Sequence, residues 1–311
     1  MSANWLYRCI SGAALAMLLL AGPAATHAAP PAKAQTEFTT PEVAVAALIE
    51  AVGKNDHTGF RALMGPGGER LLESGDKVAD ATARKDFLAS YALRSQIVRQ
   101  GDTTAILTIG ADDWPLPLPI VQANGRWHFD AKAGAQEIIN RRIGRNEIAA
   151  IRTSLAFVDA QQVYHERQGA FASHLFSRPG KHDGLYWDAA PGELESPFGP
   201  LVAQAVGQGY PGAAQAGKKL PYFGYHFRIL RGQGVSAPDG AQSYVTGGTM
   251  DRGYALLAWP AVYGSTGIVT FEVNQAGIVF QKDLGPNTAK IAAGITLFDP
   301  DLSWARVDIT P

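Results

Sequence analysis

The sequence gathers imidazole and carboxylate side chains within one short stretch. His165 and His174 precede the run Lys181-His182-Asp183. Such groups could bind zinc or transfer a proton, and convergence of the three histidines would indicate a metal-stabilised fold. Their spacing matches no helical ligand pair, however, and no second motif accompanies them. We therefore expect a solvated helix end at His165 and a turn at Asp183, with no metal and no cofactor. Three residues remain candidate ligand contacts: Lys181, His182 and Asp183.

A second candidate is the pair of carboxylates in Asp112-Asp113-Trp114. Neighbouring carboxylates beside an aromatic ring can raise the pKa of one of them and produce a general base. The catalytic candidates are therefore Asp112, Asp113 and His128, with His128 near the mouth of a pocket. The simpler interpretation is that Asp113 caps a turn before a proline-rich strand.

Basic and aromatic side chains supply the other candidate ligand contacts. Arg141, Arg142 and Arg145 lie close together on one predicted helix and could clamp a phosphate or a carboxylate. They could instead pair with carboxylates of the preceding module and fix the angle between two domains. Arg145 and Glu147 are too close in sequence to pair along a helix, so their partners should be tertiary. Tyr225 lies in an aromatic strand and could stack on a sugar or a peptide, although core packing is the alternative.

Composition and targeting signals limit the possible functions. The 311 residues carry a net charge of −1 without a basic tail or stripe, so we expect no nucleic acid partner. Residues 1–28 combine Arg8, a short apolar run and a small-residue cleavage site, which is typical of a secretory signal peptide. Cys9, the single cysteine, lies within this segment, and Pro23 stands where a lipoprotein would carry its lipid-bearing cysteine. We expect a periplasmic or secreted protein without a stable membrane anchor after cleavage.

The elements that must position these residues form an α+β protein. After a linker at 29–36, Thr40-Pro41-Glu42 starts a helix, with further helices near Asp56 and from Asp80 to Arg94. Alternating patterns then predict four strands with a tight turn at Asn124-Gly125, and alternate prolines place one strand at an edge or a bulge. The three prolines are Pro115, Pro117 and Pro119. Residues 37–133 form the first predicted domain.

The second predicted domain, residues 134–311, begins with the longest helical pattern in the chain. This helix runs from Gly134 to Gly169, and Gly144 interrupts its pattern, as at a kink or a close contact. Strands then recur up to Asp283, and the last two form a hairpin. We expect one long helix whose first half closes the first domain and whose second half packs on an antiparallel sheet. Its predicted buried face consists of Ile148, Ile151, Leu155 and Val158.

Three resemblances follow from these segments. The element order of 37–131 resembles the cone-shaped nuclear-transport-factor-like fold, in which a curved sheet leaves a pocket. The long helix and terminal hairpin are similar to the globular heads of type IV pilins and pseudopilins, although a folded module replaces their hydrophobic assembly segment, so no filament is implied. The chain is also identified as a member of the uncharacterised bacterial family DUF2950 over residues 37–306. That resemblance implies an envelope location and no known activity. Its matching segments are Phe38–Glu42, Gly110–Pro115, Asn140–Glu147, Pro179–Trp187 and Tyr222–Phe227.

These observations favour a non-catalytic role. The expected function is to bind or organise a protein, a glycan or a small ligand of the cell envelope. The alternative is an enzyme that uses the pocket of the first domain for general acid/base chemistry, with Asp113 as the base. A cavity lined by Asp113 would favour the enzyme.

Overall fold

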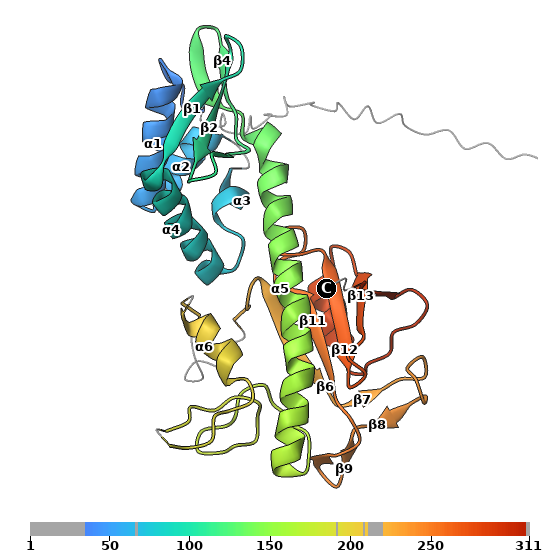
Figure 1. Ribbon diagram of the computed structural model, residues 1–311. Coiled ribbons are helices and arrows are strands. Elements are labelled where there is room, and N and C mark those ends of the chain that lie inside the picture. The colour runs from blue at the N-terminus through green and yellow to red at the C-terminus, as the bar shows by residue number, and fades with distance from the viewer. Residues whose placement is uncertain (1–34, 66–67, 191, 208, 211–219, 309–311) are drawn as a thin grey trace, which may run out of the picture. The chain divides into compact units, whose positions relative to one another are not determined.

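The computed structural model describes residues 35–308, with gaps at 66–67, 191, 208 and 211–219 (Figure 1). The predicted signal peptide at 1–28, and the linker up to residue 34, lie outside the described residues. Gln35 and Thr36, the last two linker residues, are bound to the fold: the Gln35 amide donates to the carbonyls of Leu63 and Phe129, and Thr36 N donates to Ala62 O. Helices and antiparallel sheets confirm the predicted α+β class.

The first part of the chain forms helices and then a small sheet. Its helices are α1 (Pro41–Gly53), α2 (His57–Met64), α3 (Glu69–Leu72) and α4 (Lys77–Leu93). Its strands are β1 (Ser95–Arg99), β2 (Thr104–Ile109), β3 (Trp114–Pro115), β4 (Ile120–Ala123) and β5 (Arg126–Phe129).

A long helix, α5 (Ala131–Gln168), follows, and then α6 (Gly199–Gly207) and the remaining strands. The main sheet there contains β6 (Tyr225–Leu230), β11 (Ala255–Pro260), β12 (Val269–Asn274), β13 (Val279–Asp283) and β14 (Ala305–Arg306). Two small ribbons consist of β7 (Gly232–Gln233) with β8 (Gln242–Ser243), and β9 (Val245–Thr246) with β10 (Thr249–Met250). Helix α7 (Thr288–Gly294) precedes β14.

Helix α1 begins where the sequence predicts. The Thr40 hydroxyl accepts from Val43 N, and Pro41 occupies the first turn, where its missing N–H costs nothing. Its buried face contains Ala44 and Val45, whereas Val43 is 48% exposed. Helix α2 begins after the N-cap Asp56, close to the predicted position, and buries Phe60, Leu63 and Met64.

The first sheet has the order β1-β2-β4-β5, with β3 paired to β2. Asn124 and Gly125 both have positive φ, 52° and 75°, which confirms the predicted hairpin between β4 and β5. The proline-rich strand is divided as the prolines require: Pro115 lies in the edge strand β3, and β4 begins after Pro119. Phe129 and Trp127 point into a core shared with α1 and α2.

Helix α5 confirms the predicted long helix, and Ile151, Leu155 and Val158 of its predicted face pack against the second core. It begins at the N-cap Asp130 and ends at Gly169, which has the left-handed conformation common at helix C-termini. Ile148 is 53% exposed, whereas Asn146, Ser154 and Gln161 are buried. Each of these three polar side chains donates to a carbonyl, of Thr266, Ala150 and Ala172 respectively. Hydrogen bonding removes the cost of burying them, so hydrophobicity alone misses these polar residues and wrongly includes Ile148 in the buried face.

The glycine that permits a close contact in α5 is Gly134, and the prediction at Gly144 is wrong. A Cβ at Gly134 would lie 1.7 Å from the Pro117 carbonyl oxygen, whereas one at Gly144 would meet no atom within 4 Å. The helix is also continuous through Gly144. Its first turns therefore lie directly against the chain between β3 and β4.

The second core lies between α5 and the main sheet. Phe157 and Tyr164 of α5 join Tyr225, Phe271 and other buried residues in one cluster, and α5 runs alongside β11 and β12 (Figure 1). All strands of this sheet are antiparallel, in the order β14-β13-β12-β11-β6, which confirms the predicted hairpin of β12 and β13. Within the described part of the chain, no helix is both long and apolar enough to cross a membrane.

Candidate functional site

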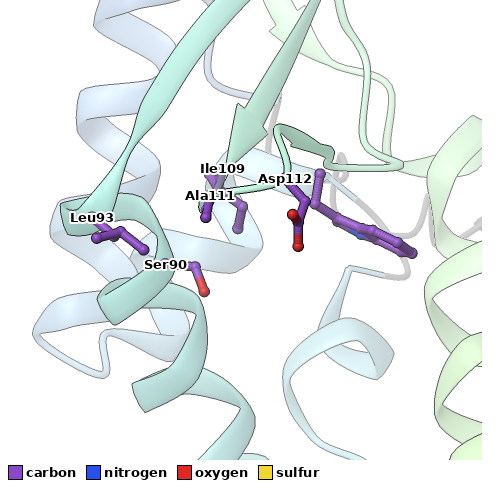
Figure 2. Close-up of a pocket in the computed structure, with 7 residues that line it drawn as sticks. Ser90, Leu93, Ile109, Ala111 and Asp112 are labelled. Carbon is purple, nitrogen blue, oxygen red and sulfur yellow. The ribbon is translucent and has the colours of Figure 1, made fainter.

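The candidate site is a pocket of about 260 Å³ at the end of α4. Ser90 and Leu93 come from the last turn of that helix, and Ile109 ends β2 (Figure 2). The turn from Gly110 to Asp112 and Trp114 of β3 complete the lining. In Figure 2, Ile109 and Ala111 lie between Leu93 and Ser90 on one side and Asp112 on the other.

Two left-handed residues shape the turn that carries the pocket. Gly110 has φ 78° and Asp113 has φ 50°, and Asp113 N donates to Gly110 O at 3.3 Å. Gly110 N in turn donates to the carbonyls of Ser90 and Arg94, at 3.1 and 2.9 Å. Aspartate tolerates the left-handed region better than most residues, so the predicted turn role of Asp113 has a physical basis.

The two adjacent aspartates of this turn have different surroundings. Asp113 forms an ion pair with Arg94 at 3.1 Å, and its Oδ1 is buried without a hydrogen-bond partner among the described residues. Asp112 is exposed at the pocket and has no ion pair or hydrogen bond within the described part of the chain. Asp113 therefore closes the turn, and Asp112 supplies the free carboxylate. The cavity is lined by Asp112 and not by Asp113.

His128 does not approach these aspartates. It pairs with Val121, which pairs with Thr104 of β2, whereas the aspartates follow Ile109 at the other end of β2. Thr104 and Ile109 are five residue steps apart along the strand, a distance of about 17 Å. The Nδ1 atom of His128 is buried and has no partner among the described residues. The strand register thus separates the two halves of the predicted catalytic set.

The arginines of α5 do not form a common clamp. Arg141 forms an ion pair with Glu137 at 2.6 Å, one turn earlier in the same helix, and its guanidinium lies 4.8 Å from the centre of the Trp114 ring. Arg142 donates to the Leu71 carbonyl at 2.9 Å, in the first part of the chain. The side chain of Arg145 is exposed and makes no ion pair or hydrogen bond with any described residue, so the tertiary partner predicted for it is not found there.

Glu147 has the tertiary partners that the spacing predicts. Its Oε1 accepts from Ile268 N at 3.0 Å and Val269 N at 3.2 Å, at the start of β12. This contact attaches α5 to the main sheet.

The loop with Lys181, His182 and Asp183 is held by its own contacts. Burial raises the pKa of the Asp183 carboxyl, but hydrogen bonds from the Arg178 amide and guanidinium outweigh it, so the pKa lies below its ordinary value. The His182 ring stacks on Trp187 with 4.5 Å between centroids, and its carbonyl accepts from Tyr164. Lys181 is exposed.

The other two histidines make separate contacts. His165 stacks on Phe171 at 4.4 Å, and His174 Nδ1 lies 3.3 Å from the Asp183 carbonyl oxygen. No group of three or more His, Cys, Asp or Glu side chains suited to a metal ion occurs among the residues that the structure describes. The hypothesis of a metal-stabilised fold therefore gains no support from the geometry.

Tyr225 lies in the core instead of at a surface. Its side chain is fully buried, and its hydroxyl donates to Val269 O at 2.8 Å. Burial, followed by the nearby charge of Glu147, raises the pKa of this hydroxyl. Tyr225 therefore packs in the core, which was the alternative to its predicted role as a ligand contact.

Sequence reasoning missed a buried carboxylate that joins distant segments. Asp76 is 1% exposed; its Oδ1 caps α4 by accepting from Val78 N and Ala79 N. Its Oδ2 accepts from the Tyr210 hydroxyl at 2.8 Å and from Gly224 N at 2.7 Å. A helix N-cap was recognisable at Asp76, but no local pattern could show its partners 134 and 148 residues away.

Glu272 is the second missed carboxyl. It is 2% exposed in the centre of β12, and burial raises its pKa to about 8, with the charges of Asp299 and Asp301 adding to the rise. A charged residue among apolar strand neighbours was the available signal. Glu272 does not line the pocket at the end of α4, so it is not part of the candidate site.

Comparisons with known proteins identify one family. The sequence profile described as "Protein of unknown function (DUF2950)" matches residues 35–307. No curated protein and no solved structure matches the chain.

Proposed function

Since the chain belongs to the DUF2950 family of proteins of unknown function, we propose a function from its own geometry: it is a non-catalytic binding protein of the bacterial cell envelope. The protein is exported by its N-terminal segment to the periplasm or the medium. It uses the pocket between α4 and β3 to hold an apolar group of an envelope component. The proposed partner classes are a protein, a glycan or a small ligand.

The observation that carries this proposal is a pocket with apolar walls and a single free carboxylate. Leu93 and Trp114 beside it are 71% and 56% exposed. Large apolar side chains left in water beside a concave surface are typical of binding sites. Asp112 and the Ser90 hydroxyl are the polar side-chain groups of the lining, and they can orient a ligand.

The enzyme alternative has less support. General acid/base catalysis needs a base within hydrogen-bond reach of the reacting group and a second group to complete the proton transfer. Asp113 is engaged with Arg94, and the register places His128 about 17 Å away along the strands. Neither group lines the pocket.

Filling the pocket tests the proposal. Mature protein, residues 29–311, and its Ala111→Trp variant are immobilised and incubated with the solubilised native envelope. Bound protein, glycan and lipid are then measured by mass spectrometry. Ala111 is exposed in the pocket lining, so an indole there should occupy the cavity without disturbing the core. We expect the wild type to retain a component that the variant loses.

The matched control is Ala123→Trp, which adds the same side chain at an exposed hairpin position outside the pocket. It should retain the same component as the wild type. Equal recovery on Ala111→Trp, or no recovery on the wild type, would contradict the proposed function.

A further inference from the structure

The pocket lining contains one charged residue, Asp112, and two arginines near it are already paired. Arg94 is paired with Asp113, and Arg141 is paired with Glu137, at 3.1 and 2.6 Å. Asp112 has no such partner within the described chain. The last turn of α4, which supplies Ser90 and Leu93, contains no basic residue, and Arg94, which follows it, is engaged with Asp113. Among the residues that line the pocket, Asp112 is the charged one, so the lining presents a negative charge to its ligand.

The walls restrict what kind of cation fits. Leu93 and Trp114 remain largely in water beside the carboxylate. A small free amine would neutralise Asp112 and leave both apolar side chains exposed. A lysine side chain combines an ammonium group with an apolar stem, and the apolar neighbours of that lysine in a polypeptide would cover Leu93 and Trp114.

Arginine fits less well than lysine. Its particular advantage is stacking of the guanidinium on an aromatic face. Arg141 already covers one face of the Trp114 ring, with 4.8 Å to the ring centre. A lysine needs no such face, because its charge is compact.

We propose that the pocket binds a lysine side chain, flanked by apolar residues, of a partner protein. This inference rests on the proposed binding function and specifies its ligand: the ammonium group pairs with Asp112, and the flanking residues pack on Leu93 and Trp114.

Peptide titration tests the inference. The probes are the blocked peptide acetyl-Ala-Leu-Lys-Leu-Ala-amide and the same peptide with Nε-acetyllysine, which keeps the stem and removes the charge. Each is titrated into ¹⁵N-labelled mature protein, and amide shifts at Ser90, Leu93 and Gly110–Trp114 are followed by NMR. We expect saturable shifts with the lysine peptide and about fivefold weaker binding of the acetylated one, since an exposed ion pair contributes up to about 1 kcal/mol.

Two variants separate the ion pair from general charge effects. Asp112→Asn should abolish the difference between the two peptides, because it removes the carboxylate and keeps the shape. Asp102→Asn removes an exposed carboxylate from the loop between β1 and β2 and should leave the difference intact.

The outcomes distinguish the inference from the function on which it rests. Equal affinity of the two peptides for wild-type protein, or an unchanged difference in Asp112→Asn, would overturn lysine recognition while the pocket remains a binding site. Absence of any binding by either peptide would also overturn lysine recognition. The proposed function itself is then decided by the envelope capture with Ala111→Trp.

Discussion

Two carboxyl groups show how strongly surroundings alter one chemical group in this protein. Asp112 is free and exposed, whereas Glu272 is buried in the centre of a sheet. Glu272 accepts a long hydrogen bond of 3.4 Å from Asp299 N, and burial raises its pKa to about 8. Three charged residues act on this carboxyl: Asp299 and Asp301 oppose its ionisation, and Lys282 favours it. At neutral pH the folded protein therefore holds a proton on Glu272 that the unfolded chain releases.

This proton makes stability depend on pH. The pKa of Glu272 rises from an ordinary 4.5 to about 8 on folding. The contribution of Glu272 to the free energy of unfolding is therefore fully present below pH 4.5 and is lost as the pH rises through about 8. We expect the free energy of unfolding to fall between pH 5 and pH 8 by roughly 1 kcal/mol per pH unit from this group alone. Urea denaturation followed by circular dichroism at several pH values measures it.

The variant Glu272→Gln should remove that slope, because the amide keeps the acceptor for Asp299 N and does not titrate. Glu166→Gln changes an exposed carboxylate of α5 and should leave the slope as in the wild type. Parallel pH profiles for wild type and Glu272→Gln would show that Glu272 ionises normally in the folded state.

At the scale of elements, α5 connects the two cores through polar contacts as well as apolar ones. Its Arg142 guanidinium donates to the Leu71 carbonyl in the first part of the chain. Its Glu147 carboxylate accepts from the backbone N–H of Ile268, just before β12. Its buried Asn146, Ser154 and Gln161 are all hydrogen-bonded. Close packing is concentrated at Gly134, against the Pro117 carbonyl.

The two glycines of α5 provide a matched pair of substitutions. Gly144→Ala should stabilise the protein by about 0.5–1 kcal/mol, because alanine favours a helix interior and its methyl group meets no atom within 4 Å. Gly134→Ala should destabilise it by about 1–3 kcal/mol, because the methyl group overlaps the backbone of Pro117. Chemical denaturation of both variants checks the signs. Stabilisation by both would mean that α5 does not lie against Pro117.

Over the whole molecule, Asp76 connects segments that are distant in the sequence. It caps α4 and accepts from Tyr210 and Gly224, while the neighbouring Ser74 carbonyl accepts from the Ser265 hydroxyl at 3.4 Å. Gly224 suits this junction because it has φ 72°, and a Cβ there would lie 2.5 Å from Asn146 Nδ2. The first core and the main sheet are thereby linked through one buried carboxylate.

Removing that carboxylate should cost more than removing an ordinary helix cap. Asp76→Ala deprives the Tyr210 hydroxyl and Gly224 N of their acceptor, and each unsatisfied group costs about 1–3 kcal/mol in addition to the cap. Asp56→Ala is the control, since Asp56 caps α2 through Gly59 N alone and should cost about 1 kcal/mol. Equal losses of unfolding free energy in the two variants would contradict a linking role for Asp76.

Local signals in the sequence determined much of the architecture. Thr40-Pro41-Glu42, Asn124-Gly125 and the alternate prolines act through their nearest neighbours, so the start of α1, the β4–β5 hairpin and the divided strand followed from residue chemistry. The length of α5 and the β12–β13 hairpin followed from periodicity in the same way.

Only the tertiary structure decided which residues of α5 are buried, which carboxyl has a raised pKa and where the pocket lies. The buried face of α5 depends on carbonyls supplied by distant loops, and the state of Glu272 depends on what covers β12. The separation of His128 from Asp113 depends on strand register, and the pocket depends on the approach of α4 to the turn before β3. The periodicity of a sequence depends only on the hydrophobicity of its side chains. Burial and pKa depend also on contacts with other segments, and a local pattern does not contain that information.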